Sequence, residues 1–334
     1  MKIKDISKVG RLNEKLNKIL ILIIAIELLF LSFYLFEFYR KKTRPIDNVK
    51  TEISQCFQAG KRYTLDEATQ EAGACDVEIS SDEDLVKLQT AGAKLSNVRS
   101  IYFRKTQNTN LPAEIGNLRN LTILNFHHTF NTSLPAEIGK LKKLTVLKMD
   151  QADIENIPSE IGNLSSLDSL ILINNAKKIS LPSDIEKIKK LKVLALSFNP
   201  AVFLPTTLVK NQSLEDLDLT GSNIREIPSS IYKLRNLKIL NLSSNQITRI
   251  SSEISNLTSL IGLKLYDNQL VDIPSLSGLK NLKSLDLSNN NLIKIPEEIV
   301  GLTQLKYLNL SGNRLNLSEI ENLKELLPDA QIVY

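Results

Sequence analysis

The chain has 334 residues but only two histidines, two cysteines and no tryptophan. The histidines, His127 and His128, are adjacent, so they do not supply the spaced ligands of a metal site or an obvious His-dependent triad. Cys56 and Cys75 lie 19 positions apart and lack the Cys-x-x-Cys spacing of redox and zinc motifs. We therefore expect no metal, no cofactor and no enzymatic activity.

Glycine is also scarce, and none of the 12 glycines belongs to a glycine-rich phosphate-binding loop. Gly116, Gly139 and Gly162 instead recur in the pattern Ile-Gly-x-Leu, which indicates one position in a repeat. Asp150, Asp216 and Asp218 could be imagined as a catalytic acidic pair with a third carboxylate, but on regular strands they are expected to be exposed charges. These observations give no support to a nucleotide-binding or hydrolytic enzyme.

A ladder of leucines occupies most of the remaining sequence. The pattern Leu-x-x-Leu-x-Leu starts again every 23 residues, apart from one spacing of 24 and one of 22. The ten starts are Val98, Leu121, Leu144, Leu167, Leu191, Leu214, Leu237, Leu260, Leu282 and Leu305. A period of this length predicts a solenoid in which each repeat contacts only its neighbours.

Each repeat predicts the same three local structures. Leu214, Leu217 and Leu219 alternate with polar residues, which suits a short strand with one buried face. Asparagines follow the later strands, where their amides can bond to backbone groups in a turn; they are Asn245, Asn268, Asn290 and Asn313. Segments such as Ile227–Leu234 then have apolar residues at helical spacing after a proline, which predicts short helical or irregular turns on the opposite side.

Both ends of the array carry sequences that depart from the repeat. Residues 318–327 form an amphipathic pattern that predicts a capping helix, with Ser318 as the N-cap, and a last strand is expected at 331–334. Cys75, Val77 and Ile79 precede Val98 by about one repeat, which indicates a degenerate first repeat. We therefore place the repeat domain at residues 74–334.

The pattern Leu-x-x-Leu-x-Leu, the turn asparagines and the segments Ile-Pro-x-x-Ile-x-x-Leu together resemble the leucine-rich repeat superfamily, over about residues 74–334. The resemblance implies an α/β solenoid with a curved parallel β-sheet on the concave face and short helical or irregular convex turns. It also implies protein–protein interaction, with receptors, adhesins and regulatory scaffolds as possible roles. Abundant Lys, Ile, Leu and Asn with no Trp suggests a bacterial protein.

The N-terminal residues predict a membrane anchor. Residues 1–18 form a basic tail with six Lys and Arg. Residues 19–39 are apolar apart from Glu27, Glu37 and the polar Ser32, and are long enough to cross a bilayer. A cleaved signal peptide is the alternative, but the apolar core is long and no small-x-small cleavage site follows it. We predict a single transmembrane helix at residues 19–39, followed by a juxtamembrane linker and N-terminal cap segment at 40–73.

Flanking charge does not decide the orientation of this anchor, because six basic residues precede it and a closer cluster of four follows. A disulfide between Cys56 and Cys75 would stabilise the cap by ~3 kcal/mol through loop closure. Such a bond persists in oxidising compartments, and it favours repeats outside the cytoplasm. Two unpaired buried thiols, and a membrane-tethered regulatory scaffold that faces the cytoplasm, are the alternatives.

The outward side chains of the predicted strands form the surface on which a protein partner is expected. In the N-terminal half this surface has apolar residues with a polar rim, which indicates a docking site. The candidate residues are Ile123, His127, Val146, Lys148, Asp150, Ile171, Ile173, Val193 and Phe198. The alternative is that β-propensity alone favours Ile and Val on strands. The net charge of +5 lies largely in the first 50 residues, so no nucleic acid partner is expected, and the oligomeric state stays open.

Overall fold

A computed structural model describes residues 62–70, 74–107, 110–130, 132–154 and 156–334, which belong to one compact unit. The predicted basic tail, the predicted transmembrane helix at 19–39, most of the segment 40–73 and Cys56 lie outside the described residues. Among the residues that are described, no helix is both long enough and apolar enough to cross a membrane.

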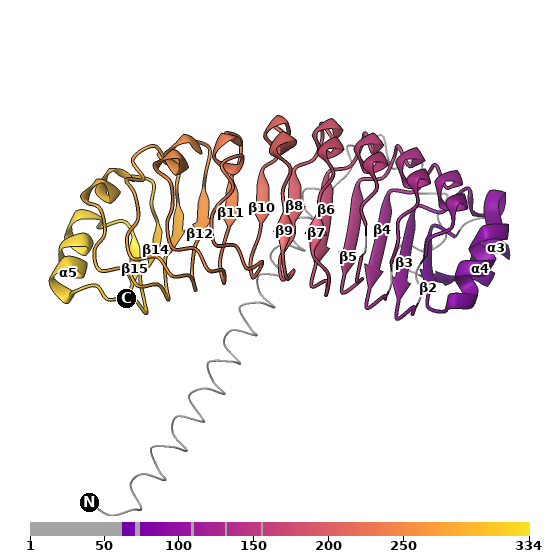
Figure 1. The fold of residues 1–334 in the computed structure, drawn as a ribbon, viewed down its shortest axis with the longest axis horizontal. Coiled ribbons are helices and arrows are strands. Elements are labelled where there is room, and N and C mark those ends of the chain that lie inside the picture. Colours follow the sequence, from indigo (N-terminus) through magenta and orange to yellow (C-terminus); the bar gives the residue numbers. More distant parts are fainter. Residues whose placement is uncertain (1–61, 71–73, 108–109, 131, 155) are drawn as a thin grey trace, which may run out of the picture. The chain divides into compact units, whose positions relative to one another are not determined.

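A long parallel β-sheet runs through this unit and bends along its length (Figure 1). In the described part of the chain it has 13 strands, which pair in chain order apart from β7 and β9. The strands are β1 (Tyr63–Thr64), β2 (Asp76–Ile79), β3 (Ser100–Arg104), β4 (Ile123–His127), β5 (Val146–Asp150), β6 (Ser169–Ile173), β8 (Val193–Ala195), β10 (Asp216–Asp218), β11 (Ile239–Asn241), β12 (Gly262–Lys264), β13 (Ser284–Asp286), β14 (Tyr307–Asn309) and β15 (Gln331–Val333). A separate two-stranded sheet contains β7 (Ile179–Ser180) and β9 (Val202–Phe203). The predicted solenoid with one strand in each repeat is confirmed.

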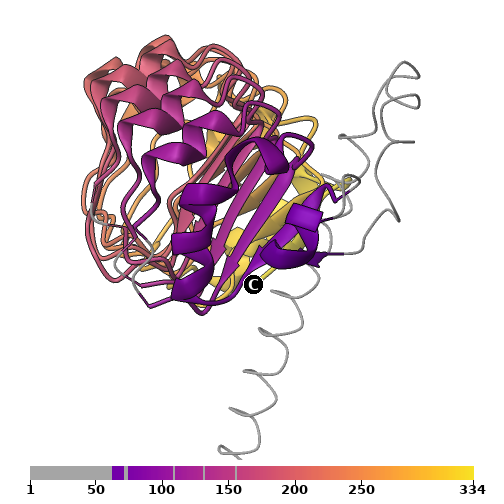
Figure 2. The same cartoon turned by 90° about the vertical axis from the view of Figure 1, so that its right-hand side faces the viewer.

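Short 3₁₀ helices form the second layer, as Figure 2 shows along the array from its N-terminal repeats. They are η2 (Gly92–Leu95), η3 (Ala113–Asn117), η4 (Ala136–Lys140), η5 (Ser159–Asn163), η6 (Ser183–Lys187), η7 (Thr206–Lys210), η8 (Ile231–Lys233), η9 (Ser252–Asn256) and η10 (Glu297–Gly301). Pro112, Pro135 and Pro158 stand at the N-cap positions of the first repeats, with φ between −72° and −68°. Proline holds φ near these values, so it positions the chain for the turn that follows.

The recurring glycines are explained by the contact between neighbouring 3₁₀ helices. A Cβ atom added at Gly116 would lie 2.8 Å from the Glu137 carbonyl oxygen, and one at Gly139 would lie 2.6 Å from the Glu160 carbonyl oxygen. Carbon and oxygen atoms do not approach that closely, so the helices stack at their observed separation only because these positions lack side chains.

The predicted asparagine ladder is confirmed. The Asn245 side-chain oxygen accepts from the backbone N–H groups of Ser222 and Ile224, at 3.0 and 2.9 Å, and its amide donates to the Leu219 and Leu242 carbonyls. Equivalent bonds are made by a set of buried or half-buried asparagines, namely Asn175, Asn199, Asn268, Asn290 and Asn313. Each asparagine therefore links its own turn to the preceding repeat.

Both ends of the core are covered. At the C-terminus the capping helix is α5 (Leu317–Leu326), followed by β15. The predicted N-cap Ser318 was wrong: Asn316 is the N-cap, and its side chain accepts from the Glu319 N–H at 2.8 Å. Ser318 instead lies inside the helix and donates to the Asn316 side chain.

The N-terminal end begins earlier than the sequence predicts. The degenerate first repeat is present as β2 and α4 (Asp82–Ala91). Ahead of it, β1 and α3 (Leu65–Gln70) add another strand and helix, with Tyr63 and Leu65 almost completely buried. The segment lies within the linker and cap segment predicted at 40–73. Its strand and helix were not predicted, because it has too few residues to display a period.

The core lies between the sheet and the 3₁₀ helices. The inward leucines of each strand are buried, as Leu214, Leu217 and Leu219 illustrate, and the rings of Phe103 and Phe126 stack at 4.6 Å between centroids. Burial of one such aliphatic side chain is worth ~1.5 to 3 kcal/mol. Because the residues at the two ends cover the last repeats, this core is continuous from β1 to β15.

Candidate partner-binding face

The side chains that point away from the core form three rows across the N-terminal strands, as the strand registers define. The first row is Ser100, Ile123, Val146, Ser169 and Val193; the second is Tyr102, Asn125, Lys148, Ile171 and Ala195; and the third is Arg104, His127, Asp150 and Ile173. Neighbours in a row lie about 4.8 Å apart in a parallel sheet, so their side chains touch. We call this surface the strand face.

The predicted apolar residues fall into two groups on the strand face. Ile171 and Ile173 on β6 adjoin Val193 on β8, and Ala195 pairs with Ile171 in the second row. Ile123 and Val146 form a second pair in the first row. Ser169, which is only 3% exposed, separates Val146 from Val193. All five predicted Ile and Val side chains are half-buried, so each still presents apolar surface to solvent.

Phe198 lies in the turn that follows β8 and extends the β6–β8 group toward the edge of the sheet. Its backbone has a φ of 56° and its side chain is 49% exposed. A Cβ atom at Gly221 would lie 2.6 Å from the Phe198 ring, so the ring rests on the turn of the next repeat only because that residue is glycine.

The predicted polar rim is brought together around one carboxylate. Asp150 lies 3.4 Å from both His127 Nδ1 and Lys148 Nζ, and accepts from the Asn174 amide at 3.0 Å. Its side chain is 14% exposed. Burial lowers the pKa of His127 below its usual value although Asp150 opposes the shift, so the imidazole is neutral at pH 7.

A small hollow of about 210 Å³ adjoins this rim, and sequence reasoning did not assign it. Its lining adds Tyr102, Arg104 and Asn125 to the predicted His127, Lys148 and Asp150. The side-chain oxygen of Asn125 is buried and has no hydrogen-bond partner. A buried oxygen without a donor is costly, so Asn125 is a local weakness in the packing beneath the hollow.

The N-terminal cap holds one wall of this hollow in place. The Arg62 guanidinium lies 4.0 Å from the centre of the Tyr102 ring and 3.3 Å from Glu78, which also lies 3.6 Å from Arg104. The alternation of buried and outward side chains along β3 predicted that Tyr102 and Arg104 lie on the strand face. The contribution of Arg62 had no signal in the sequence, because it precedes the recognisable repeats.

The C-terminal half of the strand face uses its polar residues internally. The Asp218 carboxylate accepts from both the N–H and the hydroxyl of Thr220, and Asp286 accepts in the same way from Ser288. These carboxylates therefore cap the ends of their strands. No group of three His, Cys, Asp or Glu side chains in the described residues is placed to hold a metal ion.

Cys75 lies immediately before β2 and takes part in a disulfide bond. Cys56 lies outside the described residues, so its pairing with Cys75 stays a prediction. The half-buried Cys75 accepts backbone hydrogen bonds from Arg99 and Ser100, which join the cap to β3.

The fold and the continuous strand face define a repeat protein of the leucine-rich class. A family described as "Leucine-rich repeat region" matches residues 76–203 and 183–274, and one described as "Leucine rich repeat" matches residues 269–315. These matches cover more than half of the chain, which therefore belongs to the leucine-rich repeat family. No curated protein matches it.

Solved structures of this class resemble the chain at low sequence identity. An internalin, InlF from Listeria monocytogenes, is 25% identical, with a TM-score of 0.61 over 78% of this chain and 72% of the internalin. The plant peptide hormone receptor RGFR1, solved in complex with RGF2, is 27% identical, with a TM-score of 0.60 over 77% of this chain. TLR13, solved in complex with ssRNA13, is 25% identical, with a TM-score of 0.63 over 82% of this chain. The match covers only 41% of each of the two receptor chains.

Proposed function

We propose that this chain is a membrane-anchored, non-catalytic protein that binds a protein partner through the N-terminal half of its strand face. The observation that carries the proposal is the apolar group on β6 and β8, where Ile171, Ile173 and Val193 present surface to solvent beside a polar hollow. An apolar centre with a polar rim is the usual composition of a protein-binding surface.

The other regions of the strand face offer less to a partner. Asp218 and Asp286 are engaged by their own turns, and Gly262 is buried. The hollow, by contrast, is lined by the exposed Arg104 and by His127 and Lys148, so it suits a polar side chain of a partner. The internalin and the hormone receptor are of the same fold, and the receptor was solved with its hormone, which supports a protein or peptide partner here.

Crosslinking tests the location of the site. The photoreactive residue p-benzoylphenylalanine is placed at Phe198 or, as a matched control, at Phe203, which is 54% exposed on β9 of the separate sheet. We expect illumination of cells to give a discrete protein adduct from position 198 and none of that mass from position 203. The same adduct from both positions, or from neither, would contradict the proposed site.

The membrane anchor and the side on which the repeats lie are separate parts of the proposal. The apolar residues 19–39 support the anchor, and the disulfide of Cys75 supports an extracytoplasmic location. Protease treatment of intact cells, with epitopes on the N-terminal tail and on the repeats, tests both. We expect only the repeat epitope to be lost, once any outer membrane has been permeabilised. Protection of the repeats together with a cytoplasmic control would instead identify a tethered cytoplasmic scaffold.

A further inference from the structure

Charge is distributed unevenly over the repeat unit although its net charge is close to zero. The first 61 residues hold 12 of the chain's 42 Lys and Arg and 6 of its 37 Asp and Glu, so residues 62–334 have 30 basic and 31 acidic residues. A net charge of −1 gives no reason to expect an anionic partner. The net charge, however, hides a concentration of basic residues at a few positions of the repeat.

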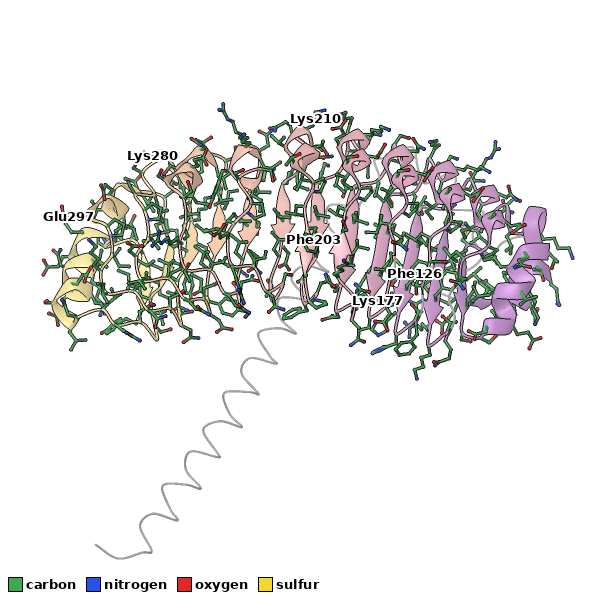
Figure 3. All side chains as sticks on the ribbon, viewed as in Figure 1. Phe126, Lys177, Phe203, Lys210, Lys280 and Glu297 are labelled. Atoms are coloured by element: carbon green, nitrogen blue, oxygen red, sulfur yellow. The ribbon has the colours of Figure 1, made fainter. Side chains whose placement is uncertain are left out.

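The relevant positions lie where each strand begins. They are the two residues before the first leucine of a repeat and the one residue after it. The residue after the leucine donates its backbone N–H to the same position of the preceding repeat, at 2.7 to 2.9 Å, in an unbroken series from Thr122 to Gln331. These positions therefore form continuous rows along one edge of the sheet, which we call the strand-start edge. Lys280 marks it in Figure 3.

The strand-start edge is strongly basic. Its cations are Arg99, Arg119, Lys142, Lys143, Lys189, Lys190, Lys192, Arg235, Lys238, Lys280, Lys283 and Lys306, and its only carboxylates are Asp168 and Glu215. All of these cations except the half-buried Arg99 are exposed. Asp168 pairs with Lys192 at 3.5 Å and Glu215 with Lys238 at 2.8 Å, which leaves an excess of ten positive charges on the edge. One of these ten, Lys306, pairs with Asp329 outside the edge at 3.2 Å.

The adjoining 3₁₀ helices reduce this excess without removing it. Together η2 to η10 hold five lysines and eight carboxylates, so the combined net charge is still +7. Several of these carboxylates are already paired with lysines of the same layer, including Glu137 with Lys140 and Glu186 with Lys210. The four lysines Lys142, Lys143, Lys189 and Lys190 form no ion pair in the described structure.

We propose that the strand-start edge docks on a lipid bilayer that contains anionic phospholipids. Eleven exposed cations along one edge match a surface with many phosphate groups, and each such Lys or Arg strengthens attachment. Nucleic acid fits the edge less well, because no aromatic side chain occupies these positions to stack on a base. The apolar residues 19–39 of the same chain also favour a lipid over another polyanion.

Lysine labelling of the full chain tests the docking. The chain is combined with vesicles of phosphatidylcholine alone, or of phosphatidylcholine and phosphatidylglycerol in a two-to-one ratio, and exposed amines are acylated and quantified by mass spectrometry. With the anionic lipid we expect Lys142, Lys143, Lys189 and Lys190 to react at least about threefold more slowly, and high salt to remove the difference. Lys105, Lys178, Lys264 and Lys294, which lie elsewhere, should react equally in both vesicles.

Two matched variants assign the effect to the edge. K142Q/K143Q/K189Q/K190Q removes four edge charges, and K105Q/K178Q/K264Q/K294Q removes four charges elsewhere. We expect Lys280 and Lys283 of the edge variant to lose most of their protection by the anionic vesicles, and the same lysines of the control variant to keep it.

Three results would overturn the proposal. Equal labelling in the two kinds of vesicle would show that the edge does not contact anionic lipid. Protection that is spread over the control lysines would show attachment without a preferred edge. Protection of the edge by a single-stranded oligonucleotide, but not by the anionic vesicles, would assign the edge to nucleic acid.

Discussion

Asn245→Ala tests whether the asparagine ladder joins neighbouring repeats. Asn245 is 8% exposed and makes hydrogen bonds to both its own turn and the preceding one. The change leaves the N–H groups of Ser222 and Ile224 without their acceptor, in a position that water does not reach easily. One buried unsatisfied group costs ~1 to 3 kcal/mol, so we expect a loss of ~2 to 6 kcal/mol in the free energy of unfolding.

Asn236→Ala is the matched control. Asn236 is exposed, lies immediately before the repeat that contains Asn245 and donates to the Gln212 carbonyl at 2.7 Å. Water can replace that bond, so the expected loss is within ~0.5 kcal/mol. The two changes delete the same atoms, and only the burial and number of hydrogen bonds differ.

Urea unfolding followed by circular dichroism measures the two losses, and hydrogen exchange locates them. Asn245→Ala should accelerate exchange at the Ser222 and Ile224 amides before the rest of the array, because repeats are stabilised through contacts with their neighbours. Equal losses from the two variants, or unchanged exchange at those two amides, would show that Asn245 does not join neighbouring repeats.

Three further predictions concern the strand face, the 3₁₀ layer and the polar rim. Ile171→Asp with Ile173→Asp should leave the circular dichroism spectrum unchanged, because both side chains are half-buried. The double change should reduce crosslinking through position 198 by about thirtyfold, the equivalent of ~2 kcal/mol at a binding hot spot. Normal crosslinking would exclude this apolar group as the site. Gly278→Ala should lower the free energy of unfolding in urea by ~1 to 3 kcal/mol, because its Cβ would overlap the Ser255 carbonyl. Gly301→Ala is the control at the equivalent position, where Lys280 Nζ is 3.6 Å away, and should change that free energy little. Equal urea midpoints for the two variants would contradict this prediction. Burial lowers the pKa of His127 from 6.5, so the unfolded state binds more protons than the folded state near and below that pH. The melting temperature should therefore be highest above pH 6.5 and fall as the pH drops through it. His127→Gln should reduce that fall, and an unchanged pH profile would argue against the lowered pKa.

Much of the fold could be predicted from the sequence because one repeat determines its own local structure. The alternation of Leu214, Leu217 and Leu219 is the pattern of a strand with one buried face, and Asn245 follows at the turn that needs its amide. The capping helix was also predictable from its amphipathic pattern. Its start was misplaced because Asn316 and Ser318 are both good N-cap residues, and the choice depends on backbone geometry.

The candidate site was predictable only in part. Alternation placed Ile171, Ile173 and Lys148 on the strand face, but it did not reveal which residues of other repeats lie beside them. Ser169 divides the apolar residues because the register aligns it with Val146 and Val193. The hollow at Asn125 likewise depends on side chains from three strands.

The period, the faces of each strand and the positions of the turns can be read from the amino-acid sequence, because they follow from interactions within about 23 residues. The tertiary structure alone decided which side chains of successive repeats meet. That outcome depends on backbone hydrogen bonds between strands, as at Ile171 and Ala195, and on close packing, as at Gly221 and Phe198. Such contacts join residues that are a whole repeat apart, so no pattern within a single repeat contains them.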